Sequence, residues 1–194
     1  MGGIDIFLNY IQRSSFITII VLTWLSIYFI VSFTILFSRM AGIGAWQKRE
    51  QNALEALLMG AKNIPNDSSL KKCASGRISK EKLNVCISIA EKNATSGLTW
   101  LSVIASTSPF IGLFGTVVSI LETFSQLGNG AGSSLGVIAP AISEALVATG
   151  CGIFVAIPAY TFNLLIKRKA YELMSVIERQ AGVMIALKKD DETL

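Results

Sequence analysis

Residues 139–159 read APAISEALVATGCGIFVAIPA, a run of apolar and small residues with one glutamate, Glu144. Within residues 134–166 Glu144 is the only charged side chain. About 20 mainly apolar residues suffice for a helix to cross a membrane, so the segment predicts a transmembrane helix. A charge near the bilayer centre costs at least about 2.5 kcal/mol. We therefore expect Glu144 to face a bundle interior or a wet cavity, in an ion pathway or at a partner. A protonated structural glutamate, hydrogen-bonded to a neighbouring helix, is the alternative.

Two other segments are equally apolar. Residues 14–38 contain FITIIVLTWLSIYFIVSFTILF, and residues 97–121 contain LTWLSVIASTSPFIGLFGTVVSIL. Only 15% of the chain is charged, against roughly 25% in soluble proteins, and the mean hydropathy is +0.56. The predicted fold class is an all-α membrane protein with three transmembrane helices. We expect the first helix to be short, and the second and third to be long and to extend into the cytoplasm.

Lysine and arginine are distributed unevenly between the loops. Residues 39–96 carry ten of them and the segment from Lys167 carries six, whereas residues 122–133 carry none. The positive-inside rule then places the N-terminus outside and the C-terminus inside. The predicted organisation is a periplasmic N-terminus (1–13), the first span (14–38), a cytoplasmic helical loop (39–96), the second span (97–121), a short periplasmic loop (122–133), the third span (134–166), and a cytoplasmic C-terminal helix and tail (167–194).

The segments predicted outside the membrane have helical periodicity. Residues 45–62 place Leu54, Leu57, Leu58 and Ala61 on one face, and NIPNDSS (63–69) follows as a breaker. Residues 79–100 start at a serine cap, Ser79, and contain no evident break before the second span. Residues 168–189 continue the third span with regularly spaced apolar residues.

Several function classes are excluded by what the sequence lacks. There is no histidine, and no Walker loop, GxGxxG or HExxH motif, so we expect neither an enzyme nor a cofactor or metal site. The three cysteines fit no metal motif, and their odd number argues against a disulfide framework. The basic residues form no stripe interleaved with aromatic residues, so no nucleic-acid partner is expected. Energy for any work should come from an ion gradient.

Small residues recur every three or four positions in the third span. They are Ala141, Ala145, Ala148, Gly152, Ala156 and Ala159. Such stripes let membrane helices approach closely, so we interpret this one as a packing face with Glu144 at its edge. Thr116 and Thr149 are hydroxyls at membrane depth, although a lone threonine usually bonds the carbonyl four residues earlier in its own helix.

SPFIGLFGTVVSI (108–120) and APAISEALVATGCGIFVAIPA (139–159) closely resemble the second and third membrane helices of the MotA/TolQ/ExbB family. The predicted topology is also similar to that of the family. The resemblance implies a homopentamer in the bacterial cell inner membrane. A dimer of a single-span TolR/ExbD-like protein would occupy the pore, and a TolA/TonB-like protein and membrane lipid would be further partners. The translocated ion would be H⁺, with no cofactor.

The resemblance also implies roles for particular residues. Glu144, Thr149 and Thr116 match the polar residues that line the ion pathway. The partner-helix contacts and structural motif positions are Pro109, Gly112, Gly115, Ala148 and Gly152. The sequence departs from the family pattern at Val118-Ser119, at Ser143 and at Gly150-Cys151, which removes no pore hydroxyl or carboxylate.

The implied function is that of a stator subunit driven by proton motive force. The short cytoplasmic loop argues against a flagellar MotA. The lead-in DIFLNYI (5–11) favours a TolQ-like role in outer-membrane integrity and constriction, and ILFSR (35–39) favours an ExbB-like role in TonB-dependent uptake of iron-siderophores. A stand-alone channel or transporter and a purely structural scaffold are the alternatives from other classes.

Overall fold

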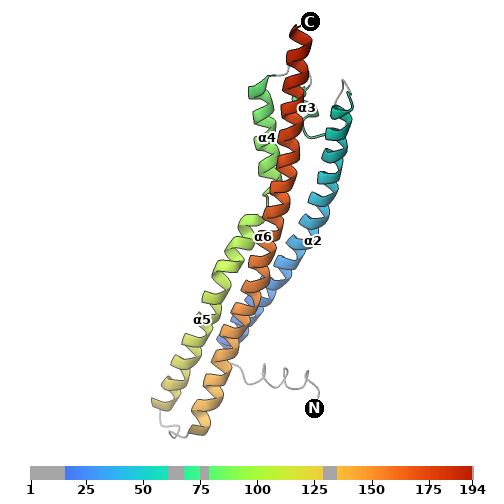
Figure 1. The fold of residues 1–194 in the computed structure, drawn as a ribbon. Helices are drawn as coiled ribbons and strands as arrows, with labels where there is room; N and C mark the ends of the chain where they lie inside the picture. The colour runs from blue at the N-terminus through green and yellow to red at the C-terminus, as the bar shows by residue number, and fades with distance from the viewer. Residues whose placement is uncertain (1–15, 61–67, 75–78, 129–134, 194) are drawn as a thin grey trace, which may run out of the picture. The chain divides into compact units, whose positions relative to one another are not determined.

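The computed structural model describes residues 16–60, 68–74, 79–128 and 135–193. The helices in these ranges are α2 (Phe16–Leu58), α3 (Lys71–Ala74), α4 (Lys80–Ala94), α5 (Leu98–Gly128) and α6 (Leu135–Thr193), and the same ranges contain no strand (Figure 1). Three helical segments are long and apolar enough to cross a membrane: Phe16–Leu58, Lys80–Ser125, which includes α4, the turn after it and most of α5, and Ile138–Lys188. The predicted fold class, an all-α protein with three such helices, is confirmed.

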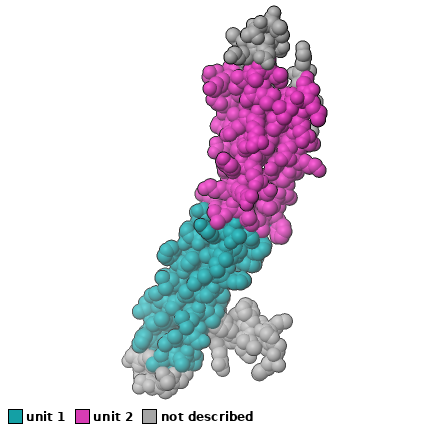
Figure 2. Space-filling model, viewed as in Figure 1, with its two compact units in different colours: residues 1–34, 100–162 teal, residues 35–99, 163–194 magenta. Residues whose placement is uncertain are grey.

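The chain divides into two compact units, which Figure 2 colours separately. Unit 1 comprises residues 1–34 and 100–162, which include most of the three predicted spans. Its core joins α2, α5 and α6, and the buried residues in it are Val21, Leu25, Ile104, Ala148, Val155 and Ala159. Aromatic contacts extend this packing, since the rings of Phe29 and Phe154 stack at 5.8 Å between centroids.

Unit 2 comprises residues 35–99 and 163–194. The predicted apolar face of residues 168–189 is confirmed, because Leu173, Ile177 and Met184 are buried. The Ser79 cap is also confirmed: the backbone N–H of Lys82 donates to the Ser79 hydroxyl over 3.2 Å. On α2 the expected face is only partly buried, since Leu57 is inside and Leu58 is exposed.

Two expectations about helix lengths are wrong. The first helix is not short: α2 continues without interruption for 43 residues, and Gly42 and Gly44 lie within it. Residues 45–58 keep helical periodicity, and no proline follows the span in α2. The second helix does not run back through residues 79–96. It begins at Leu98, because the chain turns at Thr95–Gly97, where Gly97 has φ +88°. A left-handed residue cannot continue a right-handed helix, and glycine tolerates it best.

The cysteine expectation is also corrected. Cys73 on α3 and Cys86 on α4 form a disulfide, and Cys151 is the free cysteine. An odd number of cysteines leaves one unpaired but does not prevent a single bridge where two helices bring thiols together.

A buried carboxylate holds unit 2 together. Glu50 on α2 is fully buried, and so is Gln180 on α6. One carboxylate oxygen accepts from the Trp46 indole N–H (3.0 Å) and from the Ser69 backbone N–H (2.8 Å). The other accepts from the Ser68 hydroxyl (3.1 Å) and the Gln180 amide (2.9 Å). The network therefore ties two long helices to the turn before α3.

Glu50→Ala should lower the free energy of unfolding by about 3 kcal/mol or more, because it leaves several buried donors without an acceptor. Thermal unfolding of the detergent-purified protein measures this. Glu55→Ala is the matched control, since Glu55 is an exposed carboxylate on the same helix. Equal stability of the two variants would contradict the structural role of the network.

The same network predicts a pH dependence. Burial raises the pKa of Glu50, but hydrogen bonds from Ser69, Gln180 and Trp46 outweigh it and hold the pKa below its ordinary value of 4.5. A carboxylate with a lowered pKa contributes stability above its unfolded-state pKa and loses it as the pH falls through the folded value. The stability gap between the wild type and Glu50→Ala should therefore narrow below about pH 4.5.

Candidate functional site

The two segments that carry the family resemblance, residues 108–120 and 139–159, meet where α5 crosses α6 in unit 1. A Cβ on Gly112 would lie 2.7 Å from the backbone oxygen of Ala148, and a Cβ on Gly152 would lie 2.6 Å from that of Ser108. Real side chains do not approach backbone so closely, so only glycine fits at these two positions. The predicted packing face is confirmed, because Ala145, Ala148, Gly152, Ala156 and Ala159 are buried.

The remaining structural positions of the motif lie along the same crossing. A Cβ on Gly115 would lie 3.1 Å from the Ala148 side chain and 3.3 Å from Val21 of α2. Gly115 therefore admits a third helix to the contact between α5 and α6. Pro109 is half-buried, and α5 continues through it as an α-helix.

The close approach brings Thr116 and Thr149 together. Their hydroxyls hydrogen-bond to each other across the two helices. Thr116 also lies 3.1 Å from the backbone oxygen of Ala145 on α6, and Thr149 lies 3.3 Å from that of Gly112 on α5. Thr149 thus bonds across the crossing instead of to its own preceding turn. The two threonines form an interhelical polar link. Thr116 also lies 3.3 Å from the backbone oxygen of Gly112 in its own preceding turn, which is the local bond expected of a lone threonine.

Glu144 lies on the same stretch of α6 but outside this link. It precedes Thr149 by five residues, which is about 140° around the helix. The side chain is half-buried, beside the fully buried Ala145. On its other side lies Val147, three residues further along the helix, which is 41% exposed. The predicted position at the edge of the packing face is confirmed, and in a single chain this edge is partly open.

A buried hydrogen bond joins α2 and α5, and it was not predicted from the sequence. The hydroxyls of Thr18 and Ser119 lie 3.1 Å apart, and both side chains are buried. Ser119 follows Thr116 by three residues and so lies near it on α5. That spacing was the available signal, whereas nothing in the sequence paired Ser119 with Thr18. The described residues of unit 1 therefore include two interhelical hydroxyl pairs, one between α5 and α6 and one between α2 and α5.

The part of the chain that the structure describes contains no evident set of metal ligands. No group of three or more His, Cys, Asp or Glu side chains there could hold a metal ion. The crossing offers hydroxyls and main-chain oxygens, with the Glu144 carboxylate at its edge, and groups of these kinds can exchange protons.

Comparison with known proteins gives consistent results. The model of the MotA/TolQ/ExbB proton channel family matches residues 49–179. The biopolymer transport protein ExbB-like 1 of Helicobacter pylori is 40% identical over 188 residues, which cover 95% of this chain and 100% of the relative. ExbB of Pseudomonas putida is 34% identical over 72% of this chain and 41% of its own. The Tol-Pal system protein TolQ of Pseudomonas aeruginosa is 44% identical over 40% of this chain and 33% of its own.

Gly112→Ala and Gly152→Ala should each destabilise the protein by about 1–3 kcal/mol, because the added methyl group forces two backbones apart. Gly150→Ala is the matched control on α6, since a Cβ there meets nothing within 4 Å. The control should be neutral or slightly stabilising, as alanine is the better helix former. Thermal unfolding in detergent compares the three. Indistinguishable melting temperatures would refute the close crossing.

Proposed function

Because the chain belongs to the MotA/TolQ/ExbB proton channel family, we propose that it is the proton-channel subunit of a motor driven by proton motive force. The motor would sit in the bacterial inner membrane, with H⁺ as the translocated ion. Proteins of this family energise transport and are not enzymes. The chain itself is an integral membrane protein with three helices fit to cross a bilayer.

The observation that carries the proposal is the polar group at the α5–α6 crossing. Thr116 and Thr149 bond across the helices, and Glu144 lies half-buried at the edge of the same packing face. Polar and ionisable groups are costly at membrane depth and mark ion pathways there. We assign Glu144 the part of the ionisable group in the pathway, with the two hydroxyls as its polar lining.

The assembly we propose is a homopentamer around a dimer of a single-span protein like TolR or ExbD. Members of this family generally work with such partners and with TolA or TonB. An exposed apolar side chain beside Glu144 supports a partner on this face. Val147 follows Glu144 by three residues, so it lies near it on the surface of α6, and it is 41% exposed in one chain; a neighbouring copy or a pore helix would cover it.

The orientation we propose puts the N-terminus in the periplasm and the C-terminus in the cytoplasm. The distribution of lysine and arginine supports it, since the loops assigned to the cytoplasm carry 16 of the 17. Unit 2 would then lie largely on the cytoplasmic side, where exposed charged residues of the 39–96 segment such as Lys48 and Arg49 meet water.

Two roles within the family compete. The relatives that match along their whole length are named ExbB-like, which supports an ExbB-like role in biopolymer transport energised through a TonB-like protein. The TolQ relatives match 77 residues, and the DIFLNYI lead-in favours a TolQ-like role in outer-membrane integrity. We take the ExbB-like role as the first to test.

Glu144→Ala should abolish function in cells that depend on this chain, because the pathway loses its ionisable group. The measurement is growth or uptake dependent on the chain, with membrane levels of the protein followed by blotting. Glu122→Ala is the matched control, since Glu122 is the other carboxylate in the described part of unit 1. Normal function of Glu144→Ala at a normal protein level would remove Glu144 from the pathway.

The two roles separate in a deletion strain. An ExbB-like role predicts loss of iron-siderophore uptake with detergent resistance retained, and the wild-type chain should restore uptake. A TolQ-like role predicts detergent sensitivity with uptake retained. Uptake of radiolabelled iron-siderophore and survival on detergent plates, measured in the same strain, decide between the two. If the deletion strain keeps both iron-siderophore uptake and detergent resistance, the result argues against both roles.

A further inference from the structure

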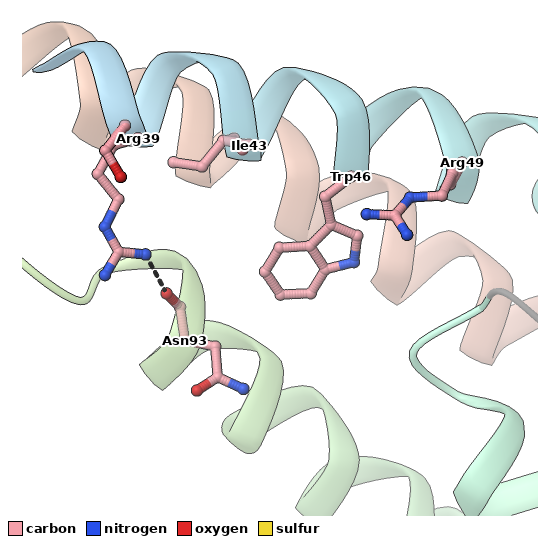
Figure 3. A pocket seen from close by; sticks show the side chains of 7 residues that line it. Arg39, Ile43, Trp46, Arg49 and Asn93 are labelled. Atoms are coloured by element: carbon pink, nitrogen blue, oxygen red, sulfur yellow. Dashed lines mark hydrogen bonds between the residues drawn. The ribbon is translucent and has the colours of Figure 1, made fainter.

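Unit 2 contains a pocket between α2 and α4 that the proposed proton pathway does not use. Its volume is about 230 Å³, well above the roughly 30 Å³ that one water molecule occupies in the liquid. Figure 3 shows Arg39 and Arg49 of α2 on either side of Trp46, with Asn93 of α4 facing them. The pocket is large enough for a small polar group but below the usual size of a drug-like site.

Two cations line this pocket without an acidic partner. In the ranges that the structure describes, neither Arg39 nor Arg49 forms an ion pair; the salt bridges there join Arg168 and Lys169 to Glu172. Arg39 donates one N–H to the Asn93 backbone oxygen over 3.4 Å, and Arg49 donates one to Ala45 over 3.4 Å. A guanidinium has five N–H donors, so both retain donors for an anion.

The side chain of Trp46, which lines the pocket between the two arginines, is held in place by hydrogen bonds. The Trp46 indole N–H is committed to Glu50 and to Ser69, at 3.0 and 2.8 Å, and Ile43 beside it is buried. The ring therefore cannot turn away without breaking the Glu50 network. Gly42 also lines the pocket, and a Cβ there would meet nothing within 4 Å. The pocket is thus preformed and open at that position.

We propose that this pocket binds the headgroup of an anionic phospholipid of the cytoplasmic leaflet. The choice of ligand rests on the proposed topology, in which the first span ends at residue 38 and Arg39 directly follows it. Arginine pairs with phosphate through charge-assisted, often bidentate hydrogen bonds, and tryptophan is enriched at the membrane interface. Arg49 lies about 15 Å from Arg39 along the axis of α2. Two cations separated in this way favour a headgroup that has further oxygen atoms in addition to those of its first phosphate.

The test uses the full chain purified in detergent and titrated with lipid in native mass spectrometry. The probes are phosphatidylglycerol, cardiolipin and zwitterionic phosphatidylcholine. The wild type should retain the two anionic lipids over phosphatidylcholine, and Arg39→Gln/Arg49→Gln should weaken their binding roughly tenfold or more. Lys48→Gln is the matched control, because it removes one positive charge from the exposed surface of α2 outside the pocket, and it should bind as the wild type does.

Two further variants keep the test decisive if the double substitution impairs folding. Arg49→Gln alone changes an exposed residue, and Gly42→Leu fills the pocket while keeping both charges. Each should weaken anionic lipid binding with an unchanged melting temperature. Wild-type binding by these variants, or an equal loss in Lys48→Gln, would overturn the proposal.

Inorganic phosphate distinguishes the source of the anion. If millimolar phosphate stabilises the wild type but not the double variant, and anionic lipid binds both alike, a soluble phosphate is the ligand and the lipid assignment fails. The outcome is independent of the proton-channel proposal, because lipid binding is measured on the chain alone. Loss of function in Glu144→Ala with unchanged lipid binding in Arg39→Gln/Arg49→Gln would refute this inference only.

Discussion

The contact between the backbones of α5 and α6 is the constraint on which unit 1 depends. Gly112 and Gly152 leave no room for a Cβ between the helices. Helices in lipid gain little from the hydrophobic effect when they associate, so close van der Waals packing and interhelical hydrogen bonds must hold them together. Both forms of contact coincide here, because the approach that the glycines permit also brings Thr116 against Thr149. The same crossing therefore supplies the packing and places the polar residues.

The two units bury polar groups in different ways. Unit 1 uses neutral hydroxyls, which bond to each other and to main-chain oxygens at small desolvation cost. Unit 2 buries a carboxylate, Glu50, and satisfies it with donors from α2, α6 and the turn before α3. In the described residues no buried side-chain nitrogen or oxygen lacks a hydrogen-bond partner. A buried charge is tolerated only when it is fully bonded, and Glu50 meets that condition outside the predicted spans.

Sequence patterns predicted the features that repeat locally. The three apolar helices, the small-residue face of α6 and the Ser79 cap all follow from spacing within one segment. The features that were missed depend on a second segment. Glu50 lies four residues before Leu54 and seven before Leu57, which places a carboxylate on an apolar face, but its partner Gln180 is 130 residues away. The Cys73–Cys86 bridge and the Thr18–Ser119 pair are of the same kind. The turn at Gly97 was missed because one glycine weakens a helix without necessarily ending it.

The threonine link has a property that follows from counting its hydrogen atoms. Each hydroxyl has one proton, and either oxygen can be the donor in the bond between them. When Thr116 donates to Thr149, Thr149 can donate onward to Gly112; in the opposite sense Thr116 donates to Ala145. Both arrangements use the same heavy-atom positions. The local dipole can therefore reverse by rotation of two O–H bonds, without movement of either helix, and can follow the arrival or departure of a positive charge nearby.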